Sequence, residues 1–263
     1  DSERMRGNFS SHAGDYDRYA CVQKRVVELL CSKGCGLDVK PGMIRGVGAG
    51  TGALAAAIAS RVSENPRGMV DIAQGLTLEA AQRMPGAFAC DGDARFLPFR
   101  DHSFATVVSS SVYQWVNCLP TAFTEVARIL KPGGLFAMAL FGEKTLHELR
   151  SSHRRAVADN NQSRSSHVQS FPDVNEVSAA IELAGLSCHE LCSTMEVEYH
   201  SDVPDLLRQL KQIGASNAAA DRPRGLASRQ VMQSMMKEYE RSYRCEAGLP
   251  ASYEVIITLA QKF

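Results

Sequence analysis

Short apolar runs alternate with amphipathic segments over the first half of the chain. The apolar runs predict β-strands at 42–47, 68–72, 86–90, 104–110 and 134–141. Segments with helical spacing of apolar residues lie between them at 53–62, 76–84 and 118–130. This alternation is typical of βαβ units, whose right-handed crossovers place helices on both faces of a parallel sheet. The pattern therefore predicts an α/β fold.

The pattern changes after Phe141 and predicts more helices and two further strands. We expect helices at 143–158, 173–184, 203–213 and 226–243, and strands at 186–199 and 253–260. Asp173 is a candidate N-cap, Gly185 ends the helix that follows it, and the polar stretch 159–170 is interpreted as a loop or mobile lid. A single domain is expected, with a lid helix at about 9–35, a core at about 40–142, 171–200 and 251–263, and cap insertions at about 143–170 and 201–250.

Composition narrows the class of protein. The 263 residues are 44% hydrophobic, enough for one core, and 29 Lys plus Arg balance 29 Asp plus Glu. The net charge is therefore zero, and it does not favour a nucleic acid or a membrane surface as partner. Apolar runs such as Leu135–Phe141 are too short to span a bilayer and the first residues are not signal-like, so we expect a soluble, cytoplasmic monomer. The 8 cysteines form no Cys-x-x-Cys pair, which indicates free thiols and no metal site.

A glycine-rich loop is the first candidate for chemistry. The loop is Gly48-Ala49-Gly50-Thr51-Gly52, which follows an apolar run and precedes an alanine-rich segment. Glycine permits positive φ and lets a ligand approach the main chain without a Cβ in the way. This strand, turn and helix start therefore predict a nucleotide-cofactor loop. The loop lacks the Gly-x-Gly-x-x-Gly spacing of dinucleotide-binding dehydrogenases.

Two acids are expected beside this loop, because ligands of open α/β sheets bind at the carboxyl ends of the strands. Asp71, followed by Ile72, ends the second strand and can accept hydrogen bonds from both hydroxyls of a ribose. Asp93, followed by Ala94, can accept from the amino group of adenine, with Leu97-Pro98-Phe99 covering the ring. An N-cap or an ordinary turn acid is the alternative for each.

The segment after the fourth strand is expected at the reacting end of the cofactor. It runs from Ser109 to Trp115, and Ser109 is a candidate cofactor contact. Gln114 and Trp115, the one tryptophan of the chain, are candidates for the substrate wall. A core tryptophan is the alternative. We find no Ser/His/Asp or Cys/His arrangement and no paired carboxylates suited to hydrolysis.

These motifs resemble a known class of enzyme. The glycine loop, the two acids, Leu97-Pro98-Phe99 and Lys131-Pro132-Gly133-Gly134 are similar to class I S-adenosylmethionine-dependent methyltransferases. Five further segments resemble malonyl-acyl carrier protein O-methyltransferases of biotin synthesis: Phe9–Tyr19, Ser110–Trp115, Lys144–Leu149, Leu210–Asn217 and Pro250–Val255. The resemblance implies a Rossmann-like, mostly parallel seven-stranded sheet with a helical cap insertion.

The resemblance also implies an activity and its residues. S-adenosylmethionine would methylate the free carboxyl of a malonyl thioester, held by an acyl carrier protein or coenzyme A, with no metal. Phe9 and Tyr16 would close over cofactor and acceptor, and Lys211 and Asn217 would help to set the cap. Since the sulfonium is already a good leaving group, the enzyme mainly has to align nucleophile, carbon and sulfur, and a carboxylate acceptor would need no general base.

A basic surface is expected, since acyl carrier proteins are acidic. One candidate consists of Arg150, His153, Arg154 and Arg155, and a second consists of Arg222, Arg224 and Arg229 in the cap. A solvated helix or loop face is the alternative for each.

Three positions depart from the class. Gly46 stands where an acid usually precedes the loop, Arg45 where an apolar strand residue is expected, and Ala105 replaces a common acid. A buried arginine is costly without a partner. A small-molecule methyltransferase, for instance one acting on a quinone precursor, and a degenerate fold that has lost its cofactor therefore remain alternative interpretations.

Overall fold

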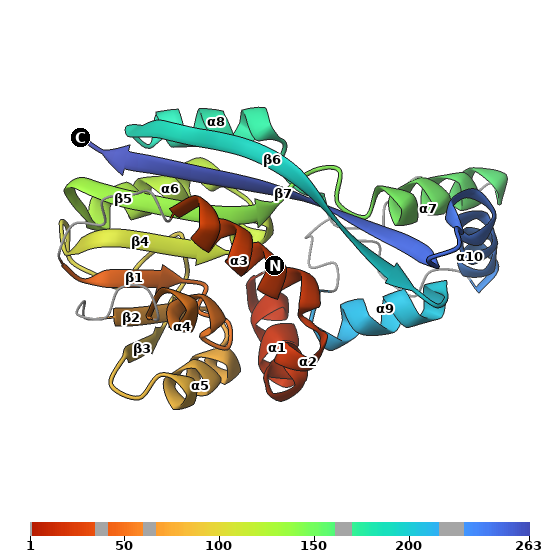
Figure 1. Ribbon diagram of the computed structural model, residues 1–263, viewed down its shortest axis with the longest axis horizontal. Helices are drawn as coiled ribbons and strands as arrows, with labels where there is room; N and C mark the ends of the chain where they lie inside the picture. Colours follow the sequence, from red (N-terminus) through yellow and green to blue (C-terminus); the bar gives the residue numbers. More distant parts are fainter. Residues whose placement is uncertain (1, 35–41, 60–66, 161–169, 216–228) are drawn as a thin grey trace.

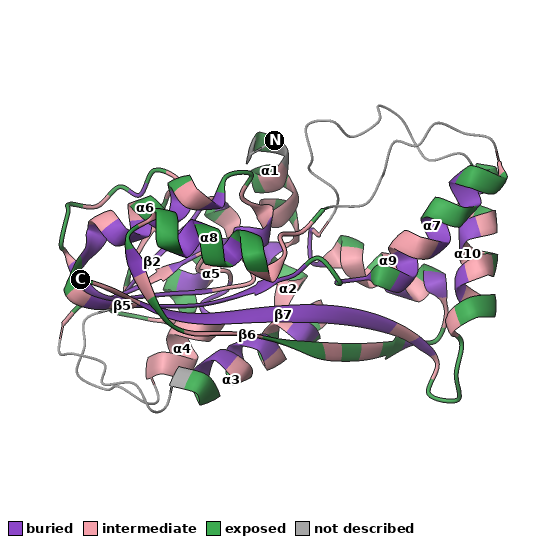
Figure 2. Ribbon diagram, turned by 90° about the horizontal axis from the view of Figure 1, so that it is seen from above, coloured by how far each residue is buried: buried purple, intermediate pink, exposed green. Residues whose placement is uncertain are grey.

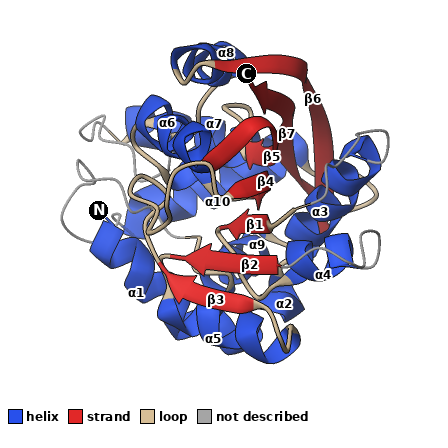
Figure 3. Cartoon of the chain, turned by 90° about the vertical axis from the view of Figure 1, so that its left-hand side faces the viewer, coloured by secondary structure: helices blue, strands red, loops and turns tan. Residues whose placement is uncertain are grey.

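The computed structural model describes residues 2–34, 42–59, 67–160, 170–215 and 229–263. Its centre is a sheet of seven strands in the order β3-β2-β1-β4-β5-β7-β6 (Figure 3). The strands are β1 (Ile44–Val47), β2 (Arg67–Asp71), β3 (Phe88–Asp91), β4 (Phe104–Ser110), β5 (Leu130–Phe141), β6 (Leu186–His200) and β7 (Leu249–Lys262). β7 pairs antiparallel with both β5 and β6, and the other pairs are parallel. The predicted fold class is confirmed.

Helices cover both faces of this sheet, as the alternating pattern requires (Figure 3). The helices are α1 (Ser2–His12), α2 (Tyr16–Tyr19), α3 (Cys21–Gly34), α4 (Ala53–Ala59), α5 (Gln74–Arg83), α6 (Leu119–Ile129), α7 (His147–Asp159), α8 (Val174–Leu183), α9 (Val203–Gln212) and α10 (Arg229–Tyr243), with 3₁₀ turns η1 (Ala13–Asp15) and η2 (Tyr113–Trp115). Residues of α3 pack with one face of the sheet, and those of α6 and α8 with the other.

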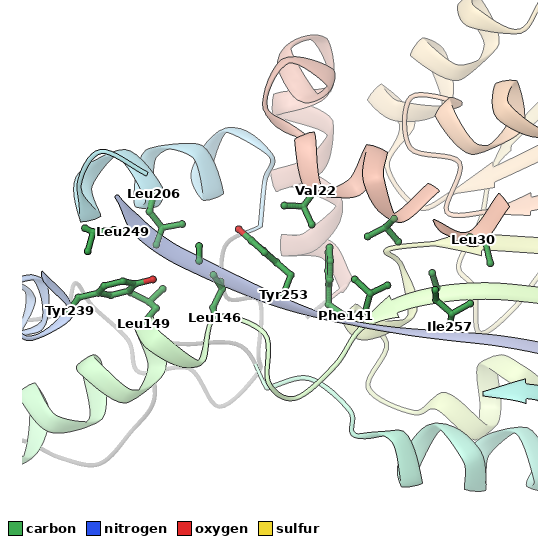
Figure 4. Packing of buried hydrophobic residues seen from close by; sticks show 14 of the residues in the cluster. Val22, Leu30, Phe141, Leu146, Leu149, Leu206, Tyr239, Leu249, Tyr253 and Ile257 are labelled. Atoms are coloured by element: carbon green, nitrogen blue, oxygen red, sulfur yellow. The ribbon is translucent and has the colours of Figure 1, made fainter. Parts of the chain in front are cut away.

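The inserted helices form a lobe at one end of the two long antiparallel strands. α7, α9 and α10 lie together beyond the parallel part of the sheet, at the right of Figure 1. Their buried residues continue the core of the sheet without a break, as Figure 4 shows for Leu149, Leu206 and Tyr239 beside Tyr253 and Phe141. β7 is buried along most of its length, whereas β6 alternates with exposed residues (Figure 2). The lobe is therefore anchored to the sheet by the extended β7.

Several predicted boundaries change in the structure. The single lid helix expected at 9–35 is broken, because Ala20 leaves helical geometry with φ −83° and ψ 47° between α2 and α3. The Pro132-Gly133-Gly134 turn lies within β5, whose pairing with β4 shifts register between Phe104 and Thr106. The capping box of α8, formed by Asp173 and Glu176, confirms the predicted N-cap.

Arg45, the unexpected charge in the central strand β1, has aromatic partners. Its guanidinium carbon lies 4.0 Å from the ring centre of Phe99, 4.7 Å from Phe104 and 5.6 Å from Phe88. The residue is only 3% exposed, and its Nη1 donates to the Met69 carbonyl oxygen at 3.4 Å. Cation–π attraction in a desolvated site offsets part of the cost of burying the charge. The buried arginine therefore does not stand without partners, which was the condition under which its burial would be most costly.

None of the described helices is long and apolar enough to cross a membrane. Every described cysteine is a free thiol, as expected.

Candidate active site

The glycine loop turns sharply at the carboxyl end of β1. Gly48 has φ +68°, and a Cβ at this position would lie 1.9 Å from Cγ2 of Val112. The amide groups of Gly48 and Ala49 both donate to the carbonyl oxygen of Val70, which ties the loop to β2. Only glycine satisfies both the backbone conformation and the close approach at position 48.

Asp71 holds the loop from the neighbouring strand. One carboxylate oxygen accepts from the amide of Gly50 and the other from the amide of Ala73, each at 2.9 Å. Burial raises the pKa of Asp71 to about 6, although those hydrogen bonds act in the opposite direction. Each oxygen retains a second lone pair. Asp71 can therefore organise the loop and still accept hydrogen bonds from a ligand.

Asp93 also lies at this end of the sheet, and it has a partner that was not predicted from the sequence. Arg95 donates to both of its carboxylate oxygens, at 3.0 Å and 2.6 Å, and lowers the pKa of Asp93. The prediction that Leu97-Pro98-Phe99 covers an adenine ring is wrong, because Leu97 is buried in the core and Phe99 packs on Arg45. Arg95 instead fixes the direction of the Asp93 carboxylate.

An acid that the sequence analysis did not single out ties the N-terminal helices to the loop. Asp17 of α2 accepts a 2.6 Å hydrogen bond from the Thr51 hydroxyl and forms an ion pair with Arg83 of α5. Arg83 also donates to the Thr51 hydroxyl at 3.2 Å. Thr51, predicted to bind the cofactor, is therefore used in fastening α2 to the loop.

Two cavities lie at this end of the sheet. The first has about 90 Å³ and is lined by the loop and by the acid-bearing strand ends. The second, of about 290 Å³, extends beneath the helices of the inserted lobe. Phe9, Tyr16, Ser111 and Trp115 line both. These four residues therefore mark where contents of one cavity could meet contents of the other.

Most predicted cofactor residues lie in the first cavity. Its lining includes Gly48, Gly50, Asp71, Ile72, Asp93, Ala94 and Phe9. Ala49, Thr51 and Gly52 are outside that lining, and Ser109 is fully buried in β4, whereas Ser110 and Ser111 line it. The register of β4 therefore moves the predicted serine contact one or two residues along the chain.

The N-terminal helices close the first cavity. The ring of Phe9 meets Trp115 edge to face with centroids 5.7 Å apart, and Trp115 meets Phe171 in the same way at 6.1 Å. α1 lies directly on α5, since a Cβ on Gly75 would be 2.7 Å from the carbonyl oxygen of Ser10. Trp115 is therefore part of the wall between the cavities and not plain core.

Tyr16 stands in the same wall with its hydroxyl protonated. Burial raises the pKa of Tyr16 far above its usual range, and the nearby charges of Asp71 and Asp17 raise it further. The phenol can donate a hydrogen bond, but at neutral pH it cannot act as a base.

The second cavity is mainly apolar with a few polar groups. Leu149 and His153 come from α7, Leu210 and Lys211 from α9, and Met235 from α10. Gln114, 4% exposed, also lines it, and its side-chain oxygen has no hydrogen-bond partner among the described residues. A long apolar cavity with few polar groups suits an extended acyl or pantetheine-like chain.

The predicted basic helix is only partly available to an acidic partner, because one of its arginines already has a partner within the chain. Arg155 forms an ion pair with Glu238 of α10, and also donates to Ser242. Arg150 and Arg154 have no ion pair in the described part of the chain. Burial lowers the pKa of Arg150, and the nearby charge of Arg154 lowers it further. Asn217, Arg222 and Arg224 lie outside the described residues, so their predicted contributions to the cap and its basic surface are not placed.

Gly46, the position of the missing acid, is not required to be glycine by packing. The nearest atom to a Cβ built there is the Gly68 carbonyl oxygen at 3.8 Å, an ordinary contact.

The strand order, with one antiparallel strand next to the edge, and the glycine loop define a class I methyltransferase. A sequence profile described as a methyltransferase domain matches residues 46–138. The solved geranyl diphosphate C-methyltransferase of Streptomyces coelicolor has the same fold, with a TM-score of 0.53 at 14% identity over 90% of this chain and 75% of that one.

Closer relatives narrow the class. A malonyl-[acyl-carrier protein] O-methyltransferase of Geobacter sulfurreducens is 40% identical over 100% of this chain and 99% of its own length. The biotin biosynthesis bifunctional protein BioHC of Teredinibacter turnerae is 34% identical over 98% of this chain but 46% of its own length. The chain belongs to the malonyl-[acyl-carrier protein] O-methyltransferase family.

Proposed function

We propose that this protein transfers the methyl group of S-adenosylmethionine to the free carboxyl of a malonyl thioester on an acyl carrier protein, in biotin synthesis. The observation that carries the proposal is the pair of cavities that share one wall, with acids in one and an apolar channel in the other. The names of the relatives that this chain matches over most of their length support this acceptor over a small-molecule acceptor or a non-catalytic role.

The first cavity fits the proposed cofactor. Asp71 has free lone pairs for the two ribose hydroxyls, and Asp93 with Ala94 lies at the position proposed for adenine. The Streptomyces methyltransferase structure holds S-adenosyl-L-homocysteine, the demethylated form of this cofactor, which supports a cofactor of this kind. When bound, S-adenosylmethionine supplies an electrophilic methyl group on a sulfonium.

The chain's own task is then alignment and charge. A malonyl carboxylate is ionised at neutral pH, so no residue has to remove a proton. Phe9, Tyr16 and Trp115 exclude water from the shared wall, which strengthens electrostatic contacts there. Lys211 brings a positive charge to the acceptor cavity and attracts an anionic acceptor over a neutral acetyl thioester.

The carrier protein is proposed to approach along α7. Arg150 and Arg154 are one turn apart with no ion pair in the described chain, which leaves their charge for an acidic partner. Arg155 is engaged by Glu238, so we assign it no part in docking.

The linkage formed distinguishes this proposal from other methylations. After reaction of labelled S-adenosylmethionine with malonyl carrier protein, the label should be released as methanol by mild alkali, because methyl esters hydrolyse easily. Label that resists alkali would indicate transfer to nitrogen or carbon and would contradict the proposal.

Two variants of α9 test the role of the acceptor cavity. Lys211→Met should raise the KM for malonyl carrier protein about tenfold, because the attraction between the lysine charge and the anionic acceptor is lost. Arg208→Met, on the same helix but outside the cavity, should leave activity unchanged, since its exposed pair with Asp205 contributes little. Equal effects of both variants would show that Lys211 acts only through the surface charge of α9.

A further inference from the structure

Ser111 occupies an unusual position in the wall between the two cavities. Of the four residues that line both, three are aromatic and Ser111 is the small polar one. It follows the last residue of β4 directly and has φ +59°, in the left-handed region. Residues other than glycine are held in this region at a cost, and such positions cluster at functional sites.

The Ser111 side chain is also left without a partner. Its hydroxyl oxygen is buried and has no hydrogen bond within the described part of the structure. The backbone amide of Ser111, by contrast, donates to the Ala139 carbonyl oxygen at 2.8 Å, which keeps the residue in register with β5. A buried hydroxyl without a partner is unfavourable and therefore indicates a place where a polar ligand group completes the site.

The position of Ser111 determines which ligand group it can reach. For an in-line displacement the nucleophilic oxygen must lie close to the methyl carbon, and that point is where the two cavities meet. Lys211 lines the second cavity alone, so its charge attracts the acceptor from further along the channel. The hydroxyl of Ser111 is at the meeting point itself.

Resting on the proposed function, we infer that the Ser111 hydroxyl donates a hydrogen bond to the acceptor carboxylate and holds its nucleophilic oxygen towards the methyl group. The left-handed backbone fixes the hydroxyl at the wall, and the rigid pairing of Ser111 with β5 prevents it from turning away. The bond is charge-assisted, so it is stronger than one to a neutral ester. The same contact therefore weakens once the carboxylate has become the methyl ester, which favours product release.

Ser111 and its neighbour provide matched variants. Ser110 also has a buried hydroxyl with no partner among the described residues, but it lines only the first cavity. Ser111→Ala should lower kcat/KM for malonyl carrier protein about 10- to 100-fold, the range for loss of a hydrogen bond to a charged group. The Kd for S-adenosylhomocysteine should change by no more than about twofold, because the hydroxyl contacts the acceptor and not the cofactor. Ser110→Ala should have the opposite bias and affect cofactor affinity more than the KM for the acceptor.

A glycine variant separates the hydroxyl from the backbone. Ser111→Gly removes the hydroxyl but suits a left-handed conformation, so the protein should melt at a higher temperature than Ser111→Ala. Its kcat/KM for malonyl carrier protein should nevertheless be as low as that of Ser111→Ala. Recovery of wild-type activity in Ser111→Gly would show that only the backbone matters and would overturn the inference.

The inference about Ser111 and the proposed function can be refuted separately. If the wild type methylates malonyl carrier protein and Ser111→Ala keeps its kcat/KM, the inference about Ser111 is wrong and the proposed function stands. An equal loss of acceptor and cofactor affinity would assign Ser111 to the cofactor and would also overturn the inference. A folded wild type that binds S-adenosylhomocysteine but methylates no malonyl thioester would overturn both.

Discussion

Affinity for the cofactor should depend on pH through Asp71. Its carboxylate lies in the cofactor cavity, and its pKa is raised to about 6, chiefly by burial. Only the ionised form leaves both oxygens as acceptors for ribose hydroxyls. The folded protein therefore has the carboxylate mostly ionised at pH 7 and mostly protonated at pH 5, where about a tenth remains ionised.

The expected size of the effect follows from that fraction. Because ribose hydroxyls favour the ionised form, the affinity for S-adenosylhomocysteine should fall about tenfold from pH 7 to pH 5 and should change little from pH 7 to pH 8. Isothermal titration calorimetry at several pH values measures this directly, with circular dichroism as the check that the protein stays folded. Asp71→Asn should bind more weakly at pH 7 and lose most of the pH dependence.

Two results would refute this reasoning. A constant wild-type affinity between pH 5 and pH 8 would show that the Asp71 carboxylate does not accept from the ligand. A pH dependence that survives in Asp71→Asn would show that a group other than Asp71 causes it.

Substitutions at three further positions test the framework around the site. Gly48→Ala combines a left-handed backbone with overlap against Val112, so it should destabilise the protein by about 2 kcal/mol or more and abolish cofactor binding, as measured by urea unfolding and calorimetry. Arg45→Ala empties the space between three phenylalanine rings and should cost about 3 kcal/mol of unfolding free energy, whereas Arg45→Met should cost much less because it refills that space. Glu148→Ala leaves the backbone amide and hydroxyl of Ser252 unpaired in a buried position and should cost about 3 kcal/mol in the same urea assay.

Each of these has a contradicting outcome. Cofactor binding by Gly48→Ala at wild-type strength would mean that the loop can be rebuilt without its left-handed turn. A more stable Arg45→Ala would mean that burying the guanidinium costs more than its aromatic contacts return. An unchanged midpoint for Glu148→Ala would mean that water replaces the lost carboxylate.

Hydrophobic periodicity was sufficient to predict the sheet and most helices. Apart from the run that forms the edge strand β3, the apolar runs are buried on one or both faces, so their spacing follows directly from the layers of the fold. Boundaries were less predictable where two backbone states compete, as at Ala20 and at Pro132-Gly133-Gly134. In the second case pairing of Leu130 with Phe104 extends the strand through a segment whose local preference is a turn.

The candidate site was predictable where one residue acts through its own chemistry. Asp71 and Gly48 lie at the ends of adjacent strands, and the fold brings such ends together. The partners Arg95 and Asp17 were missed because they act on another side chain, and the sequence contains no sign of that contact. The aromatic partners of Arg45 could not be predicted for the same reason, since the three rings come from separate strands and a loop.

The most direct test of the central claim is transfer of labelled methyl from S-adenosylmethionine to four acceptors in parallel: malonyl carrier protein, acetyl carrier protein, malonyl-coenzyme A and free malonate. The account predicts label on the malonyl carrier protein and none on the acetyl carrier protein, because only the former presents a free carboxylate to the wall between the cavities. Label on the acetyl carrier protein, or no label on any acceptor from folded protein that binds S-adenosylhomocysteine, would contradict it.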